Sequence, residues 1–201
     1  MISAPNSQPF IEKLTVSHSL TDFDCGQIEL NRFIQRYAYQ NQKANSSQTY
    51  VGIYEEVVIG YYTLTVGSVI HSQAPDRVTK GQPKHPIPVM ILARLAVDIQ
   101  WQNRGVGKGL LKDALKRTAQ AADIAGIRAL LVHAKDPDVR RWYERFNFEP
   151  SEIDPLSLFL ILKDLKKYLK VTKFIVAIST RTGVIIRRMG NVHQHIVAQF
   201  R

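Results

Sequence analysis

The sequence predicts an α/β (α+β) domain in which helices cover both faces of a mixed β-sheet. Short runs rich in β-branched and aromatic residues recur along the chain, which is typical of strands. In the second half these runs alternate with segments of helical periodicity, a pattern that places helices on both faces of a sheet. The length of 201 residues fits one domain of ordinary size with a substantial core.

The first half of the chain predicts a strand, a helix and two more strands. Residues 11–16 have the character of a short strand, and Asp24 is placed to cap a helix over "GQIELNRFIQRYAYQNQ". The strands "QTYVGIY" and "VVIGYYTLTVG" follow and are joined at Glu55–Glu56. One apolar stripe of the helix is formed by Leu30, Phe33, Ile34 and Tyr37.

The second half predicts three strands and two helices after a long loop. Residues 75–88 are rich in proline and glycine and form that loop, and the apolar run 89–97 predicts a central strand. A long helix follows and is expected to end at Gly126. "IRALLVHA" and "PLSLFLILKDL" predict two more strands, separated by the short helix "DPDVRRWYERF" with Pro137 near its start. One face of the long helix is expected to pack on the core. This face comprises Val106, Leu110, Leu111, Ala114, Leu115, Thr118 and Ala122.

The net charge of +10 is concentrated near the C-terminus. The chain has 27 Lys/Arg and 17 Asp/Glu, of which residues 163–201 hold nine basic residues and one acidic residue. Residues 30–117 carry twelve Lys/Arg against five Asp/Glu, which fits a basic surface and equally fits ordinary solvated charges.

The single cysteine, Cys25, excludes a disulfide within the chain and a thiolate metal site. The sequence lacks a signal-peptide pattern and a membrane-length apolar run, so we expect a cytoplasmic protein.

The stretch "QNRGVGKG" places glycines at the start of the long helix, where each costs roughly 1 kcal/mol against alanine. Gly105 and Gly107 would leave main-chain N–H groups open at the positive end of the helix dipole, which suits a pyrophosphate. The dinucleotide fingerprint fails because Leu110 stands at its third glycine, and the P-loop pattern fails because Gly109 follows Lys108. Taken alone, the motif barely favours phosphate binding over a glycine-rich turn without a ligand.

The segment Gln102–Gly107 resembles the Q/R-x-x-G-x-G/A signature of the GNAT N-acetyltransferases, between a strand and the following helix as in that family. The resemblance implies the GNAT acyltransferase fold, whose mixed sheet is mostly antiparallel, with acetyl-CoA as cosubstrate and no metal. It also implies that Gly105 and Gly107 leave room for the pyrophosphate, while the strand 95–97 pairs with the pantetheine amides and steadies the oxyanion. The implied cofactor contacts are Leu95, Ala96, Val97, Gln102, Asn103, Arg104, Gly105, Val106, Gly107, Lys108, His133 and Ala134.

A narrower resemblance covers roughly residues 10–165. "FDCGQIELNRFIQRYAYQNQ", "ARLAVDIQWQNRGVGKGLLKDAL" and "RRWYERFNFEPSEIDPLSLFL" resemble, in order, the GNAT toxins of bacterial type II toxin–antitoxin modules. This resemblance implies acetylation of the α-amino group of aminoacyl-tRNA, which blocks translation, together with a ribbon–helix–helix antitoxin and a homodimer. It implies a GNAT domain over residues 1–170 and leaves residues 171–201 as a basic C-terminal extension of unknown role.

Within "RRWYERF", Tyr143 matches the catalytic tyrosine of these toxins. A phenol near the sulfur can supply the proton that the departing CoA thiolate needs. Without the resemblance, Tyr143 would be interpreted as a packed aromatic residue on a helix. The usual glycine of the "RFGF" segment is Asn147 here, and asparagine tolerates left-handed backbone angles.

No histidine or carboxylate stands out as a general base. His133 is interpreted more readily as a core or rim histidine, and Glu29 and Asp98 are weak candidates. A base is less necessary for an α-amino group, whose pKa lies near 8, than for lysine at about 10.4.

A tRNA-binding surface would be electrostatic. Its candidates are Arg32, Arg36, Lys43, Arg77, Lys80, Lys84 and Arg94.

Two alternatives to the toxin interpretation stay open. A GNAT enzyme with this signature could acetylate a protein amine or a small-molecule amine. A GNAT-like module could also bind RNA or a partner without catalysis, although the glycine signature together with Tyr143 argues against this.

Overall fold

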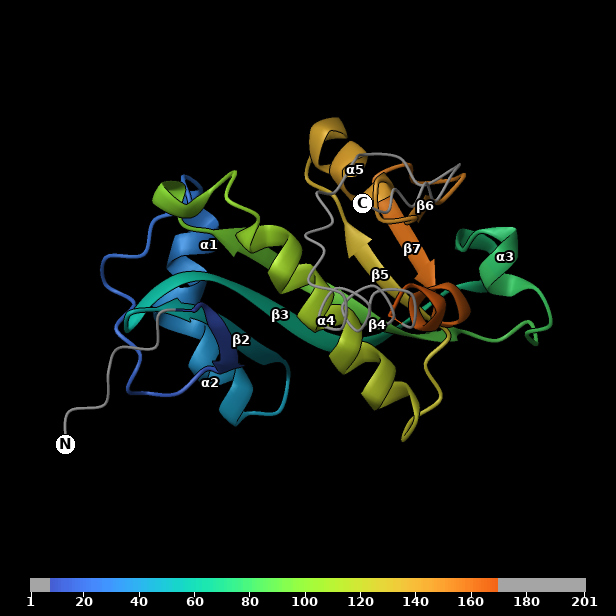
Figure 1. Ribbon diagram of the computed structural model, residues 1–201. Helices are drawn as coiled ribbons and strands as arrows, with labels where there is room; N and C mark the ends of the chain where they lie inside the picture. The colour runs from blue at the N-terminus through green and yellow to red at the C-terminus, as the bar shows by residue number, and fades with distance from the viewer. Residues whose placement is uncertain (1–7, 170–201) are drawn as a thin grey trace, which may run out of the picture.

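The computed structural model of the chain describes residues 8–169. They contain a seven-stranded sheet in the order β1-β2-β3-β4-β5-β7-β6 (Figure 1). The β4–β5 pair is parallel and the other neighbouring pairs are antiparallel, which confirms the mixed, mostly antiparallel sheet. The strands are β1 (Phe10–Lys13), β2 (Gln48–Tyr54), β3 (Val57–Val69), β4 (Ile87–Val97), β5 (Ala129–His133), β6 (Glu149–Pro150) and β7 (Ser157–Ile161).

Helices cover both faces of this sheet. On the first face, here called the α4 face, α4 (Val106–Ala122) and α5 (Pro137–Glu144) pack over side chains such as Tyr62 and Leu130. The opposite face, here called the α1 face, carries Tyr61 and Leu131, because neighbouring strand residues point to opposite sides. On the α1 face, three consecutive helical segments cover the part of the sheet around β2 and β3, and α3 covers the part around β5 and β7. These are α1 (Ile28–Arg32), η1 (Phe33–Tyr37), α2 (Ala38–Lys43) and α3 (Asp76–Thr79).

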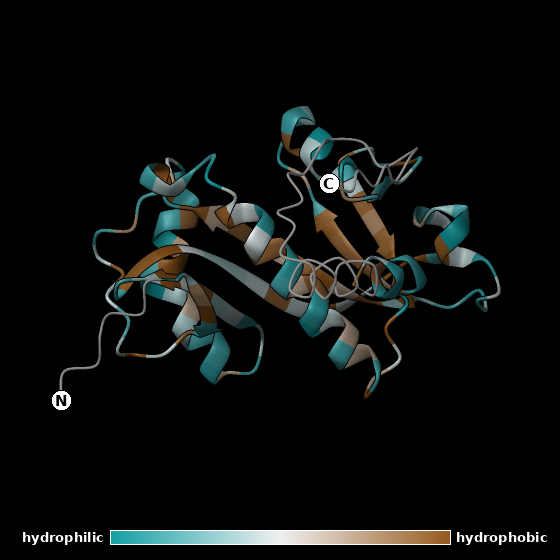
Figure 2. Cartoon of the chain, in the orientation of Figure 1, coloured by the Kyte–Doolittle hydropathy of each residue, from teal (hydrophilic) through white to brown (hydrophobic). Residues whose placement is uncertain are grey.

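The hydrophobic core follows the centre of the sheet. In Figure 2 the strands β5 and β7 are strongly hydrophobic, whereas α3 and much of α5 are hydrophilic. Two short 3₁₀ turns, η2 (His71–Gln73) and η3 (Ile99–Trp101), and a helical segment over residues 162–169 complete the described elements. Within this part of the chain, no helix has both the length and the apolar character to cross a membrane.

The first predicted helix is interrupted by a π turn. The Tyr61 hydroxyl donates a hydrogen bond to the Leu30 carbonyl (2.8 Å), and the Ala38 N–H then reaches back to the Phe33 carbonyl. The extra residue in this turn shifts the inner face by one position, so Ala38 is buried and Tyr37 is 41% exposed. The prediction of Tyr37 in the apolar stripe was therefore wrong.

Other element boundaries also differ from the sequence prediction. Asp24 does not cap the helix: its Oδ1 accepts hydrogen bonds from Gly26 N and Asn31 Nδ2, and α1 begins after Gln27. The predicted loop 75–88 contains α3 and the start of β4. The helix α4 ends at Ala122 with Asp123 as its C-cap, so Gly126 does not terminate it. The last predicted strand is shorter, because residues 162–169 are helical. The basic extension 171–201 lies outside the described residues.

Gly60 sets the distance between α4 and β3, and we expect its replacement by alanine to destabilise the fold. A Cβ at Gly60 would lie 2.9 Å from both the Ala96 carbonyl oxygen and Leu110 Cδ1, and the carbonyl belongs to a strand that cannot move freely. Overpacking of this kind costs about 1–3 kcal/mol. Urea unfolding should show that loss for Gly60→Ala. Gly126→Ala is the matched control, because a Cβ at Gly126 meets nothing within 4 Å. Equal stability of the two variants would contradict this account.

Candidate active site

The glycine loop presents open main-chain donors at the start of α4. Gly105 is the N-cap residue, with a φ of +87° that L-residues rarely adopt and with no side chain to cap the helix. The first hydrogen bond into this turn runs from Gly109 N to the Gly105 carbonyl (3.1 Å). The three N–H groups of residues 106–108 therefore have no partner within the helix and point outward at its positive end. A Cβ at Gly105 or Gly109 would meet nothing within 4 Å, so a ligand can approach closely there.

The strands β4 and β5 separate beside this loop. They pair from Val89–Ala129 to Leu92–Val132, after which β4 continues to Val97 paired only with β3, and Figure 1 shows β4 and β5 diverging. The register between β3 and β4 shifts at the same point, which leaves Ala93 as a bulge. We call the region between the separated ends of β4 and β5 the gap; along it, the β5-side edge of β4 has no partner strand.

The orientation of the β4 backbone identifies which of its polar groups face the gap. Asp98 N donates to Ile59 O (3.1 Å) in the direction of β3. Backbone groups alternate along a strand, so those of Leu95 and Val97 face away from β3 and toward the gap. The Ala96 carbonyl is directed toward Gly60 of β3. Of the three residues 95–97 implied as pantetheine contacts, Leu95 thus directs both backbone groups to the gap, whereas Val97 offers only its N–H, because its carbonyl accepts a hydrogen bond from Gln102 Nε2.

Gln102 anchors the glycine loop rather than pointing out of it. Its Nε2 donates hydrogen bonds to Val97 O (3.0 Å) and Cys25 O (3.2 Å). Asn103 adopts a positive φ of 60°, while the Arg104 guanidinium lies over the Trp101 ring, 5.3 Å from its centroid. These contacts fix the turn that leads into α4.

Tyr143 lies on α5, next to the gap. A Cβ placed on Gly107 would lie between 3.6 and 4.0 Å from Val97, Trp142 and Leu95, so these residues converge on one point. The ring of Tyr143 packs edge-on against Trp142, with centroids 4.9 Å apart. Tyr143 is thereby brought close to the glycine loop by its neighbour on the helix.

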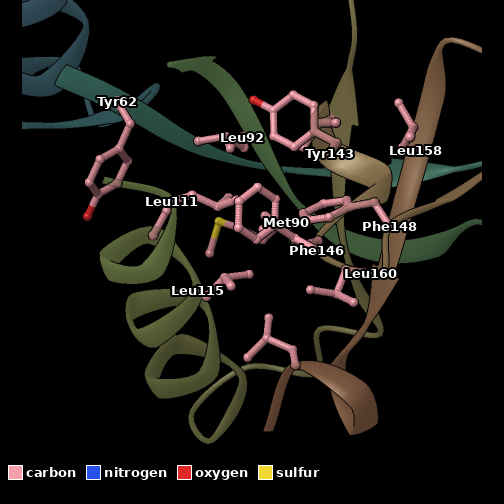
Figure 3. Packing of buried hydrophobic residues seen from close by; sticks show 14 of the residues in the cluster. Tyr62, Met90, Leu92, Leu111, Leu115, Tyr143, Phe146, Phe148, Leu158 and Leu160 are labelled. Carbon is pink, nitrogen blue, oxygen red and sulfur yellow. The ribbon is translucent and has the colours of Figure 1, made fainter. Parts of the chain in front are cut away.

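The Tyr143 ring is buried, but its hydroxyl has no hydrogen-bond partner among residues 8–169. The residue is 7% exposed, and Figure 3 shows the hydroxyl pointing away from Phe148 and Leu158 in the core. Burial raises the pKa of Tyr143 above its usual range, which keeps the phenol protonated at neutral pH. A protonated phenol that is not engaged elsewhere can donate a proton to a reacting atom.

Asp136 caps the helix that carries Tyr143, and we expect its removal to loosen this helix. The Asp136 carboxylate accepts a hydrogen bond from Val139 N (2.8 Å), and Pro137 follows at the first helical position. Asp136→Ala should lower the free energy of unfolding by about 1 kcal/mol. Asp136→Asn keeps an acceptor and should retain most of this stability in urea unfolding. Equal losses for both variants would contradict a capping role.

His133 and Ala134 lie at the end of β5, where the gap begins. The His133 side chain is exposed, and its Nδ1 lies 2.8 Å from Ser157 Oγ. Ala134 is buried, and its N–H donates to Leu156 O (2.8 Å). Both residues border the gap from the β5 side.

The two carboxylates considered as weak base candidates have different surroundings. Asp98 is buried, and its oxygens accept hydrogen bonds from Asp24 N (3.1 Å) and Gln100 N (2.9 Å). This carboxylate therefore holds two loops together. Glu29 is exposed on α1. Among residues 8–169, no cluster of three or more His, Cys, Asp or Glu side chains could hold a metal ion.

The candidate tRNA contacts fall into two separate groups. Arg32, Arg36 and Lys43 lie on the helical segments of the first half, and α3 lies at the other end of the molecule (Figure 1). The Arg94 guanidinium stacks 3.7 Å from the centroid of Phe33, so it joins the first group. The second group, around α3, comprises Arg77, Lys80 and Lys84.

Arg77 and Arg94 differ in their partners. Arg77 forms ion pairs with Glu149 and Asp164, which occupy its guanidinium. Within residues 8–169 Arg94 forms no ion pair. Arg94 is therefore the better placed of the two to bind a phosphate.

Several residues of this site were missed by the sequence prediction. Trp142 contacts the glycine loop, and Ala93 forms the bulge at which the gap opens. Ser157 is hydrogen-bonded to His133, and Asp154 is hydrogen-bonded to Ser157. Only Trp142 carried a signal in the sequence, because it directly precedes Tyr143.

Comparisons with known proteins agree with this architecture. Residues 45–150, more than half of the chain, match the acetyltransferase (GNAT) domain family. A tRNA-acetylating toxin of Mycobacterium tuberculosis is 41% identical over 154 residues, which cover 77% of this chain and 92% of the relative. AtaT complexed with acetyl-methionyl-tRNAfMet is similar in structure, with a TM-score of 0.75 and 27% identity over 81% of this chain and 99% of that chain.

A second solved structure contains a cosubstrate and a partner. It is a tyrosine-to-phenylalanine mutant of the AtaT toxin bound to the C-terminus of the antitoxin AtaR and to acetyl-CoA. Its TM-score is 0.69 at 25% identity, over 81% of this chain and 99% of that chain. On the family match and the 41% identical relative, the chain belongs to the GNAT family of acetyltransferases.

Proposed function

We propose that this protein is a toxin that transfers the acetyl group of acetyl-CoA to the α-amino group of aminoacyl-tRNA. The observation that carries the proposal is the convergence of three features at one gap: the open N–H groups of α4, the free edge of β4, and Tyr143, whose neighbour Trp142 lies beside Gly107. The tRNA-acetylating relative supports this choice of acceptor. An acetylated α-amino group cannot form a peptide bond, so the modification would block translation.

The same features define how acetyl-CoA would be held. The N–H groups of Val106, Gly107 and Lys108 bind the pyrophosphate at the helix N-terminus. The backbone groups of Leu95 and the N–H of Val97 pair with the pantetheine amides along the free edge of β4. This binding mode is supported by the open space at Gly105 and by the acetyl-CoA complex of AtaT.

The reaction is a direct attack without a covalent enzyme intermediate. The α-amino nitrogen attacks the thioester carbonyl carbon, and a β4 N–H facing the gap stabilises the oxyanion. The carbon–sulfur bond then breaks, and the Tyr143 hydroxyl donates its proton to the departing sulfur. Tyr143 carries the proton that this role requires, because burial holds its pKa above the usual range, and its hydroxyl donates to no other group among residues 8–169.

The tRNA contacts would be centred on the α1 end of the molecule. Arg94 is the candidate closest to the gap, and Arg32, Arg36 and Lys43 extend the positive charge from there along the first helical segments. Such contacts act on the phosphate backbone and weaken as salt rises. The residues around α3 would then contribute less to tRNA binding.

The partners follow from the same assignment. We propose a ribbon–helix–helix antitoxin as the inhibitor, in line with the antitoxin-bound AtaT structure, and a homodimer as the assembly. Charged tRNA is a cytoplasmic substrate, so the reaction would occur in the cytoplasm. Residues 1–170 would form the catalytic domain, and residues 171–201 a basic extension.

The test is acetyl transfer to a mixed acceptor panel. Purified protein and labelled acetyl-CoA are incubated with charged tRNA, uncharged tRNA, a lysine-rich protein and a small amine. We expect label on charged tRNA alone. Label on the protein or the small amine would favour the alternative GNAT activity. Binding of acetyl-CoA or tRNA without transfer to any acceptor would favour a non-catalytic binding module.

A further inference from the structure

His133 stands at the mouth of the gap on the α1 face, opposite Tyr143. The last β4–β5 pair is Leu92–Val132, so His133 is the first β5 residue beyond it. Leu131 belongs to the core cluster of the α1 face. Side chains two residues apart on a strand point to the same face, so the His133 side chain also lies on the α1 face. Tyr143 belongs to the cluster of the α4 face. The two side chains thus border the gap from opposite faces of the sheet.

The cationic side chain of Arg94 borders the same mouth from the other strand. After the bulge at Ala93, Arg94 pairs with Thr63 and stacks on Phe33, which packs on the α1 face. His133 and Arg94 therefore flank the side of the gap that faces away from α4.

A hydrogen-bonded chain fixes which nitrogen of His133 carries a proton. The Ser157 hydroxyl donates its only proton to Asp154 Oδ2 (2.6 Å). Ser157 Oγ must then accept from His133 Nδ1, 2.8 Å away, so Nδ1 carries the hydrogen of the neutral ring. The other nitrogen, Nε2, is left with a free lone pair, and no group among residues 8–169 hydrogen-bonds to it. Asp154 stays ionised, because its bond from Ser157 holds the pKa of that carboxyl below its usual value.

We propose that His133 is the general base that removes a proton from the α-ammonium group of the aminoacyl-tRNA. This inference rests on the proposed function and adds a catalytic residue to it. An α-amino group with a pKa near 8 is largely protonated at pH 7, so its nitrogen must lose a proton before it can attack. When Nε2 accepts that proton, the imidazolium keeps its Nδ1–H bond to Ser157, and the Asp154 carboxylate stabilises the charge.

The proton balance closes with Tyr143 on the other face. His133 takes one proton from the ammonium nitrogen and returns it to solvent, to which its side chain is exposed. The nitrogen–carbon bond forms, the carbon–sulfur bond breaks, and the sulfur takes the Tyr143 proton. The second nitrogen-bound proton, released as the amide forms, returns to the Tyr143 oxygen. The products are N-acetyl-aminoacyl-tRNA, CoA thiol and one proton.

The test compares His133→Gln and His133→Ala with the wild type on charged tRNA. Glutamine can still hydrogen-bond to Ser157 but cannot accept the proton, so we expect kcat to fall by about tenfold or more. Added imidazole should restore a large part of the turnover of His133→Ala, because it can occupy the space left by the ring. His18→Gln is the matched control: His18 also has polar partners, Thr15 and Glu12, but lies away from the gap.

Two results would overturn the proposal. The first is a folded His133→Gln variant, judged by thermal melting, whose kcat lies within about twofold of the wild type. The second is a slow His133→Ala variant that imidazole does not accelerate, because a structural role would leave no base to rescue. If the wild type does not label charged tRNA at all, the proposed function fails separately, and the same variants then test His133 with the amine that is labelled.

Discussion

Replacing Tyr143 by phenylalanine should leave acetyl-CoA binding intact and lower turnover by roughly 100-fold or more, the scale of a lost general acid. The hydroxyl makes no hydrogen bond within residues 8–169, so its removal breaks no contact that holds the fold. The aromatic contacts of the ring with Trp142 and Phe148 are kept in the variant. Single-turnover acetyl transfer and calorimetric titration with acetyl-CoA would measure the two quantities separately.

A matched control comes from another partly buried tyrosine. Tyr39 lies on α2 and packs at the edge of the core of the α1 face, so Tyr39→Phe removes a hydroxyl far from the glycine loop. Its turnover should stay close to that of the wild type. Near-wild-type turnover of Tyr143→Phe would remove Tyr143 from the mechanism. A large loss of acetyl-CoA affinity would instead make it a binding residue.

Replacing Gly105 by tryptophan should abolish acetyl-CoA binding, with a dissociation constant raised at least about 100-fold. The indole would fill the open space in front of the α4 N–H groups, which is where the pyrophosphate is proposed to sit. It would also force an L-residue into a φ of +87°. Equilibrium dialysis or calorimetric titration with acetyl-CoA would measure the change.

Replacing a second glycine separates the effect of backbone strain from the effect of filling the proposed pyrophosphate position. Gly81 has a similar φ of +75°, and a Cβ there also meets nothing within 4 Å, but it follows α3 and lies away from α4. Gly81→Trp should therefore bear a similar backbone strain and bind acetyl-CoA normally. Unchanged affinity in folded Gly105→Trp would contradict the pyrophosphate assignment.

The parts of the fold that depend on local pattern could be predicted from the sequence. The strand–helix alternation of the second half and the start of α5 at Pro137 are local features, and the structure confirms them. Asn147 adopts the left-handed φ of 64° that its place in the "RFNF" turn requires. The functional importance of Gly105 could likewise be predicted from a local feature, because a glycine at the start of a helix is unfavourable unless something requires it.

The parts that depend on distant contacts could not be predicted. The π turn depends on the Tyr61 hydroxyl reaching Leu30 from another element. The pairing of Arg77 with Glu149 and Asp164 joins α3 to segments more than 70 residues away. The contact between His133 and Ser157 requires the register of β5 with β7, which no local pattern contains. Consequently the sequence led to the glycine loop and Tyr143, whereas the surroundings of His133 emerged only from the structure.

The central claim is that the acetyl group reaches the α-amino nitrogen of an amino acid esterified to tRNA. The most direct measurement is mass spectrometry of the 3′-terminal aminoacyl-adenosine, released by ribonuclease from charged tRNA after incubation with the protein and labelled acetyl-CoA. We predict a product heavier by one labelled acetyl group, with the label on the amino acid nitrogen and lost from the RNA on deacylation. Label on a ribose hydroxyl or on a nucleobase, or no label on charged tRNA, would contradict this account.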